Sequence, residues 1–215
     1  MIVRSLSPII VVGAGHVSAE DLDFIRSAGH PVVAADGGAI ACLDAGIIPD
    51  AVIGDLDSLG GTVAAIPAER LHRVAEQETT DFDKCLRHVA APLVYSLGVT
   101  GRRLDHTLAV CTTLVERAEV RALVLGETDL LFHAPPRLAL DLPIGCRLSL
   151  FPMAPVTGRS TGLRWPIDGI DFAPSGRIGT SNEVTGPLAL SFAGPGMLVI
   201  TPREVLAQVS AALTG

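Results

Sequence analysis

The stretch from Ala35 to Ser58, which reads ADGGAIACLDAGIIPDAVIGDLDS, constrains the fold of this chain more than any other. Two short apolar runs, Pro31 to Ala35 and Ala51 to Gly54, have the pattern of buried strands, and each ends at acidic residues. The segment between them, Ala39 to Ala45, has the composition of one short helix that Gly46 closes. Two strands joined by one crossover lie parallel, so their carboxyl ends share one sheet edge, where ligands bind in open α/β folds. The stretch therefore predicts a ligand site at this edge.

Three carboxylates and three glycines lie together at these strand ends. Asp55 and Asp57 are two residues apart, so in extended chain they project to the same side and can share one cation. Gly37 and Gly38, directly after Asp36, let the backbone approach a bulky anion. Carboxylates beside open backbone indicate a magnesium-bound polyphosphate.

The overall charge limits the class of ligand. The formal net charge of −7 argues against a nucleic-acid-binding protein, which normally carries a basic stripe. An anionic substrate must therefore be received by local lysines and arginines and by a metal ion.

The cysteines are isolated, which makes disulfides and a zinc site improbable and suits a reducing cytosol. The first apolar run is too short and too interrupted by glycine for a signal or membrane segment, so we expect a cytoplasmic protein. The cysteines are Cys42, Cys85, Cys111 and Cys146.

The N-terminal segment imitates a dinucleotide-binding fingerprint. An apolar run from Ile9 to Val12 leads into Gly13-Ala14-Gly15 and then into a helical pattern from Ala19 to Ala28, with Asp36 further on. Ser18 stands where the third glycine of that fingerprint belongs. A simple strand-to-helix turn or a phosphate cradle explains the glycines better than a nicotinamide site, which stays open as an alternative.

A second polar cluster begins at Thr79 and reads TTDFDK. Thr79 or Thr80 can cap a helix with Asp81 and Asp83 in its first turn. Lys84 lies three residues after Asp81 and shares its face of the helix. On these grounds alone, a capped surface helix with one ion pair is sufficient explanation.

A third cluster, GRRLDH, follows the apolar run from Leu93 to Leu97 and a glycine turn. A glycine turn that meets a helix N-terminus beside arginines is suited to bind an anion. The alternative is that Asp105 only complements the helix dipole and that Arg103 is solvated. The position at the carboxyl end of a strand favours function.

The pattern changes after Gly126. The helical spacing of apolar residues ends there, and short runs of alternating apolar and polar residues begin, separated by proline and glycine. Such spacing is typical of an antiparallel sandwich. We therefore predict an α/β domain with a parallel, Rossmann-like sheet over residues 1–127, then an all-β antiparallel sandwich over 128–215 with a short C-terminal helix. The runs are Leu130 to His133, Arg137 to Leu142, Arg147 to Phe151, Leu188 to Phe192 and Met197 to Ile200, and the helix is Glu204 to Leu213.

Two short strings stand out in this second domain. GLRW contains Trp165, the single tryptophan, and SNE places Ser181, Asn182 and Glu183 on an expected turn. Taken alone, Trp165 reads as a residue of the sandwich core and SNE as a hairpin turn.

Taken in order, DGGA, GDLDS, TTDFDK with Gln77 ahead of it, GRRLDH, GLRW and SNE resemble the thiamine pyrophosphokinase (thiamine diphosphokinase) family. Each string is short, but their order and spacing from about Asp36 to Glu183 are specific. The sequence departs from the family's DGGAN at Ile40, which puts the nucleotide preference in question, and Arg102 has no assigned role. With the residue pattern, the resemblance implies metal contacts from Asp55, Asp57 and Asp81, with Asp36 as a further candidate. It implies nucleotide contacts from Asp36, Gly37, Gly38, Gln77, Asp81 and Lys84, and thiamine contacts from Trp165, Ser181 and Asn182. The catalytic roles fall to Asp55, Asp57, Asp81, Lys84, Arg103, Asp105 and His106.

The reaction that the resemblance implies is transfer of pyrophosphate from ATP to the thiamine hydroxyl, with Mg²⁺, to give thiamine diphosphate and AMP. Asp105 or His106 orients or deprotonates the hydroxyl. The resemblance also points to a homodimer with shared active sites, because the carboxylates and Trp165 belong to different domains. Other classes remain: a pyrophosphokinase for another alcohol such as a hydroxymethyl pterin, a nicotinamide-dependent oxidoreductase, or a nucleotide sensor without catalysis.

Overall fold

The computed structural model describes residues 1–101 and 103–215, so Arg102 lies outside the described residues. The chain divides into two compact units, Met1–Thr113 and Leu114–Gly215. The first unit ends inside helix α4 (Leu104–Glu116), earlier along the chain than the boundary expected after residue 127. The last strand that the sequence assigned to the α/β domain, β8 (Ala122–Leu125), falls in the second unit.

The first unit contains a parallel sheet with the strand order β7-β2-β3-β4-β5. The order reverses at β2, because the chain proceeds from β2 to β5 on one side and places β7 on the other. In sheets of this kind the crevice at the reversal is where ligands bind. The strands are β2 (Ile9–Val12), β3 (Val32–Ala35), β4 (Ala51–Gly54), β5 (Leu71–Arg73) and β7 (Val94–Leu97), and a separate parallel pair is formed by β1 (Val3–Arg4) and β6 (Val89–Ala90).

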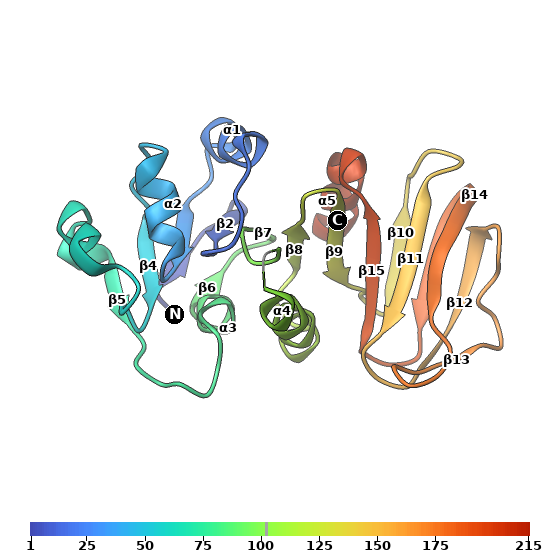
Figure 1. Ribbon diagram of the computed structural model, residues 1–215. Coiled ribbons are helices and arrows are strands. Elements are labelled where there is room, and N and C mark those ends of the chain that lie inside the picture. The colour runs from blue at the N-terminus through green and yellow to red at the C-terminus, as the bar shows by residue number, and fades with distance from the viewer. Residues whose placement is uncertain (102) are drawn as a thin grey trace. The chain divides into compact units, whose positions relative to one another are not determined.

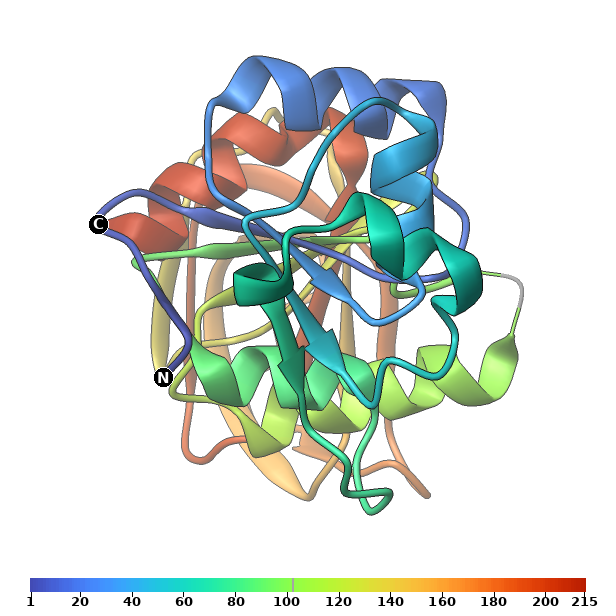
Figure 2. The ribbon, with the colours of Figure 1, turned by 90° about the vertical axis from the view of Figure 1, so that its left-hand side faces the viewer.

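Helices cover both faces of this sheet, with α1 on one face and α3 on the other (Figure 2). The sequence sets their ends: Ser18 forms a capping box with Asp21 at the start of α1, and Gly29 ends it with a left-handed φ of 64°. Thr80 caps α3 by accepting a hydrogen bond from the Asp83 amide. The elements are α1 (Ala19–Ala28), α2 (Gly38–Asp44), the 3-10 helices η1 (Gly60–Ala65) and η2 (Ala68–Arg70), and α3 (Asp81–His88).

The core of the first unit is aliphatic. The side chains of Ile9 to Val12 are fully buried, as expected for a central parallel strand. A second cluster joins β3 and β4 to α2 and η1 through Ala34, Val52 and Leu59. Leu56, in the loop after β4, packs against this cluster and anchors the loop to the core.

The second unit contains antiparallel strands and one C-terminal helix (Figure 1). Pairing runs β8-β9-β15-β11-β14-β12-β13, and β10 also pairs with β14. The expected layout of an α/β part followed by a β part is confirmed, whereas the sandwich and the Rossmann-like details stay predictions. The strands are β9 (Asp129–His133), β10 (Arg137–Leu140), β11 (Arg147–Pro152), β12 (Val156–Leu163), β13 (Asp171–Phe172), β14 (Gly179–Phe192) and β15 (Met197–Pro202), followed by η3 (Arg203–Val205) and α5 (Leu206–Thr214).

Two expectations about this unit are wrong. The string Ser181 to Glu183 lies inside strand β14 and is not a hairpin turn. Trp165 is 55% exposed and therefore is not a core residue. At Ser181 to Glu183 the local composition suggested a turn, and pairing of β14 with β11 overrode it. Trp165 lies in the bend that follows β12.

None of the helices formed by the described residues has the length and apolar character needed to cross a bilayer.

Candidate functional site

The carboxyl ends of β2 and β7 approach each other so closely that only glycine fits between them. A Cβ atom on Gly13 or on Gly15 would lie 2.5 Å from the carbonyl oxygen of Gly98. The Gly15 amide donates a hydrogen bond to the same oxygen at 2.6 Å. Backbone packing thus accounts for both glycines without a nicotinamide cofactor, and it opens the crevice at the reversal of the sheet.

Asp36 occupies a strained and buried position at the end of β3. Its φ of 41° lies in the left-handed region, which residues other than glycine rarely adopt. Its amide donates to the Ile53 carbonyl at 3.0 Å, which holds the turn against β4. Its side chain is 2% exposed, and Oδ1 has no hydrogen-bond partner among the described residues. Because buried polar atoms are nearly always paired, this oxygen is suited to a group from outside the chain.

Asp55 and Asp57 join Asp36 by a route that differs from the expected one. Leu56 between them is left-handed, with φ 67°, so this segment is not extended and alternation along a strand does not align the two carboxylates. The turn at Leu56 nevertheless brings carboxylate oxygens of all three aspartates within 4.8 Å of one another. Hard oxygen donors of this kind suit Mg²⁺.

Gln77 connects the loop before α3 to this carboxylate group. Its Nε2 donates to Asp55 Oδ2 at 2.7 Å, and the Asp57 amide donates to Asp55 Oδ1 at 3.3 Å. These two hydrogen bonds hold the pKa of Asp55 below its ordinary value, because they favour the charged form. Asp55 is therefore kept ionised and oriented.

The first turn of α3 places an ion pair beside the aspartates. Lys84 Nζ lies 3.0 Å from Asp81 Oδ1, and the lysine side chain is only 2% exposed. Burial alone would lower the pKa of Lys84, but the hydrogen bond to Asp81 and the charge of Asp55 raise it. Burial also raises the pKa of Asp81, and the neighbouring carboxylate of Asp36 adds to this effect. One buried cation thus stands among several carboxylates, an arrangement typical of a functional site.

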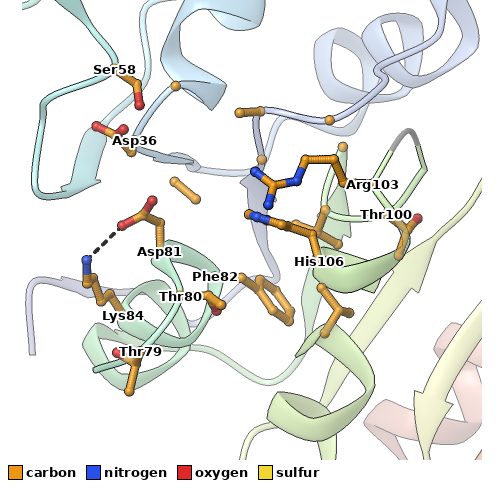
Figure 3. Close-up of a pocket in the computed structure, with 18 of the residues that line it drawn as sticks. Asp36, Ser58, Thr79, Thr80, Asp81, Phe82, Lys84, Thr100, Arg103 and His106 are labelled. Atoms are coloured by element: carbon orange, nitrogen blue, oxygen red, sulfur yellow. Dashed lines mark hydrogen bonds and ion pairs between the residues drawn. The ribbon is translucent and has the colours of Figure 1, made fainter. Parts of the chain in front are cut away.

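Arg103 and His106 face these groups across the cavity (Figure 3). Asp105 lies outside the described lining of the cavity and pairs with Arg103, 2.5 Å from Nη2. This ion pair lowers the pKa of Asp105, and both side chains are about two-thirds exposed, at 65% and 67%. Of the two residues expected to handle the hydroxyl proton, His106 is therefore the one that reaches the cavity.

The cavity that these residues enclose has a volume of about 460 Å³, within the usual range for small-molecule sites. Most of the predicted nucleotide residues line it, although Gly38 does not, because it packs against Val12 in the core. Sequence reasoning did not single out Ser58 or Thr100, which also line it. The lining residues that the sequence predicted are Asp36, Gly37, Asp55, Gln77, Asp81, Lys84, Arg103 and His106.

In the second unit, Trp165, Ser181 and Asn182 form a different kind of group. Asn182 Oδ1 accepts from the Trp165 amide at 3.1 Å, and Asn182 Nδ2 donates to the Trp165 carbonyl at 2.7 Å. Ser181 has a left-handed φ of 60°, and its amide donates to Ser149 Oγ. The Arg164 guanidinium lies 5.2 Å from the centre of the Trp165 ring. Asn182 therefore fixes the backbone of an exposed aromatic residue.

Fold and site together define an α/β protein with a carboxylate-lined crevice, suited to a metal ion, at the carboxyl edge of its sheet. The family model for the thiamin pyrophosphokinase catalytic domain matches residues 26–124. Thiamine pyrophosphokinase 1 of rice, Oryza sativa subsp. japonica, is 28% identical over 156 residues, which are 63% of this chain. The match spans 59% of the rice protein's length.

Solved structures agree with this fold. The thiamin pyrophosphokinase of Geobacillus thermodenitrificans aligns with a TM-score of 0.72 at 24% identity, over 91% of this chain and 96% of that one. The yeast thiamin pyrophosphokinase aligns with a TM-score of 0.74 at 18% identity, over 92% of this chain and 87% of that one. The resemblance to the thiamine pyrophosphokinase family that the motifs predict is confirmed by the family model and by the rice protein.

Proposed function

We propose that this protein is a thiamine diphosphokinase, which transfers pyrophosphate from ATP to the hydroxyl of thiamine and releases AMP. The observation that carries the proposal is the group formed by Asp36, Asp55 and Asp57 beside the buried Lys84. Such a site can neutralise a polyphosphate and orient it, and phosphoryl transfer requires little more from a protein.

The thiamine hydroxyl oxygen forms a bond to the β-phosphorus of ATP, and the bond from that phosphorus to the α–β bridging oxygen breaks. The bridging oxygen leaves with AMP. Lys84 and Arg103 stand on opposite sides of the cavity and stabilise the negative charge that develops on the transferred group (Figure 3). His106 accepts the hydroxyl proton, because it lines the cavity. Asp105 lies outside the described lining and pairs with Arg103.

The metal residues expected from sequence are Asp55 and Asp57, together with Asp81 or Asp36, and the group of Asp36, Asp55 and Asp57 supports including Asp36. Bound Mg²⁺ supplies positive charge to the phosphate oxygens. The hydrogen bond from Gln77 keeps Asp55 oriented for this role, and the salt bridge to Lys84 does the same for Asp81.

Thiamine recognition falls to Trp165, whose exposed ring can stack on the thiazolium cation. Ser181 and Asn182 belong to the same site, but the Asn182 amide is engaged by the backbone of Trp165. We assign Asn182 to positioning Trp165. Ser181 remains available for direct contact through its hydroxyl.

We further propose that the protein acts in the cytoplasm as a homodimer with shared active sites. The support is the separation of the proposed groups between two compact units, the carboxylates in Met1–Thr113 and Trp165 in Leu114–Gly215. A twofold dimer brings one chain's carboxylates to its partner's Trp165.

Phosphorus NMR of ATP, Mg²⁺ and thiamine incubated with the protein tests the reaction. We expect AMP and thiamine diphosphate to appear together. Formation of ADP would indicate an ordinary kinase, and unchanged ATP would indicate a nucleotide sensor. A parallel incubation with a hydroxymethyl pterin in place of thiamine tests the related pyrophosphokinase activity, and we expect no product from it.

A further inference from the structure

Glu76 and Arg87 lie outside the described lining of the cavity. Together they connect helix α3 to the turn of residues 76–79, and both of these segments contribute lining residues. The Arg87 guanidinium contacts groups on both sides of the α3 N-terminus. Its Nε lies 2.9 Å from Asp83 Oδ2, one helical turn earlier, and its Nη2 pairs with Glu76 Oε1. The same Nη2 donates to Thr79 Oγ1 at 2.8 Å. One side chain thus ties α3 to the turn that precedes it.

The Glu76 carboxylate organises that turn from within. Its Oε2 accepts hydrogen bonds from the amides of Glu78 at 2.8 Å and Thr79 at 3.0 Å. Its Oε1 accepts a further hydrogen bond from the Thr79 hydroxyl at 2.5 Å. Residues 76–79 are therefore wrapped around one carboxylate, which Arg87 neutralises.

This turn holds residues of the cavity. Gln77, Thr79 and Thr80 line it, and Gln77 reaches across to Asp55. Thr80 also caps α3, whose first residues include Asp81 and Lys84. Any change in the path of residues 76–79 must therefore change where the Gln77 amide points, and with it the orientation of Asp55.

We propose that Glu76 and Arg87 are positioning residues, which set the cation and nucleotide affinity of the site through Gln77 and Asp55. The inference rests on the proposed function, because it takes a divalent cation and ATP as the ligands. Removing a polar group that hydrogen-bonds to a metal ligand, without touching the metal itself, typically lowers metal affinity or activity by about 10- to 100-fold.

Two titrations of the full chain test the proposal: Mn²⁺ alone, and a non-hydrolysable ATP analogue with Mg²⁺, each followed by calorimetry. We expect Arg87→Met and Glu76→Gln to weaken both affinities by about tenfold. Arg87→Lys should recover part of the loss, because an ammonium keeps the charge but cannot bridge three acceptors. The double variant should be little worse than either single one, since both changes break the same contact.

The matched control is Arg26→Met. Arg26 also pairs with a carboxylate on its own helix, Asp23, and donates to the Ala45 carbonyl, remote from the cavity. It should leave both affinities unchanged. Unchanged affinities in Arg87→Met and Glu76→Gln, with only a lower melting temperature, would overturn the positioning role. A wild-type protein that binds Mn²⁺ but not the ATP analogue would instead contradict the proposed function, while the Mn²⁺ titration still decides the role of Glu76 and Arg87.

Discussion

The carboxylate crevice of the first unit and the Trp165 group of the second differ in how completely their polar atoms are paired. In the crevice, Asp36 Oδ1 is buried without a partner among the described residues, and a nearly inaccessible lysine stands among acids. Around Trp165, the side-chain amide of Asn182 uses its oxygen and its nitrogen on neighbouring backbone. The first region has a buried polar atom left to pair, whereas the second leaves only the exposed Trp165 ring and the Ser181 hydroxyl for a ligand.

The contrast shows which kind of site physics alone can identify. Buried unpaired oxygen and crowded like charges are costly, so their presence indicates a ligand. An exposed tryptophan held by ordinary hydrogen bonds has no such cost. Its assignment therefore depends on the order of motifs, and experiments that treat the two regions separately are the best test of it.

The largest expected effect is on the crevice. Asp57→Asn removes one carboxylate from the proposed metal site, so we expect turnover to fall on the order of 100-fold or more. The melting temperature should hold or rise, because repulsion among the carboxylates is relieved. Steady-state rates and calorimetric melting measure the two quantities. The control is Asp44→Asn, which changes an exposed aspartate at the end of α2. Near-normal turnover of Asp57→Asn would show that Asp57 has no part in catalysis.

Mixing variants tests whether the two regions act from different chains. Asp57→Asn and Trp165→Ala proteins, allowed to exchange subunits at low thiamine concentration, should regain up to about a quarter of wild-type turnover, because half the dimers are mixed and each holds one intact site. Mass labelling verifies the exchange. A mixture of Asp55→Asn with Asp57→Asn should regain none. Verified exchange without recovery in the first mixture would show that each chain builds its own site.

A smaller effect is expected at the exposed ring. Trp165→Ala should weaken thiamine binding by about 1–2 kcal/mol, and Trp165→Phe should retain part of it. The affinity for ATP and the melting temperature should hardly change, because the ring is 55% exposed. Thiamine titration beside thermal melting checks this, with Ile144→Ala, another exposed apolar residue of the second unit, as control. Equal thiamine affinity in Trp165→Ala and wild type would mean that this region has no part in recognition.

The smallest effect concerns acid stability of the first unit. Hydrogen bonds from Thr79 and Arg87 lower the pKa of Glu76 from 4.5 to about 2. Because the folded-state pKa lies below the unfolded one, this contribution is present above about pH 4.5 and is lost as the pH falls toward 2. Glu76→Gln should therefore give a shallower fall of melting temperature across that range. Exposed Glu69→Gln serves for comparison, and parallel curves for wild type and Glu76→Gln would contradict the expectation.

Much of the first unit could be predicted from sequence, because buried parallel strands are continuous apolar runs that end at polar residues or glycine. The strands Ile9–Val12 and Ala51–Gly54 and the helix Ala19–Ala28 have the expected bounds. In the second unit, β12 and the first part of β14 are rich in threonine, serine and glycine, and they gave no hydrophobic signal. Their structure depends on pairing with distant strands, because β12 pairs mainly with the later part of β14 and the first part of β14 pairs with β11. Local sequence does not encode such pairing.

The candidate site divides in the same way. The aspartates at strand ends follow from topology, since parallel strands deliver their carboxyl ends to one edge. The left-handed Leu56 could not be predicted, because its conformation depends on packing against a core assembled from β3, β4, α2 and η1. The contact of Glu76 with Arg87 also joins residues whose individual patterns are those of ordinary surface charges.

The buried, unpaired oxygen of Asp36 has a consequence for the lifetime of the protein in a cell. A cation that binds only the folded chain stabilises it by an amount that grows with the logarithm of its concentration, about 2.7 kcal/mol at 100 times the dissociation constant. Proteases attack the unfolded fraction, which that stabilisation reduces. With the proposed magnesium site, the abundance of the protein is tied to the supply of the free ion, so that a shortage of magnesium lowers the amount of folded chain as well as its activity.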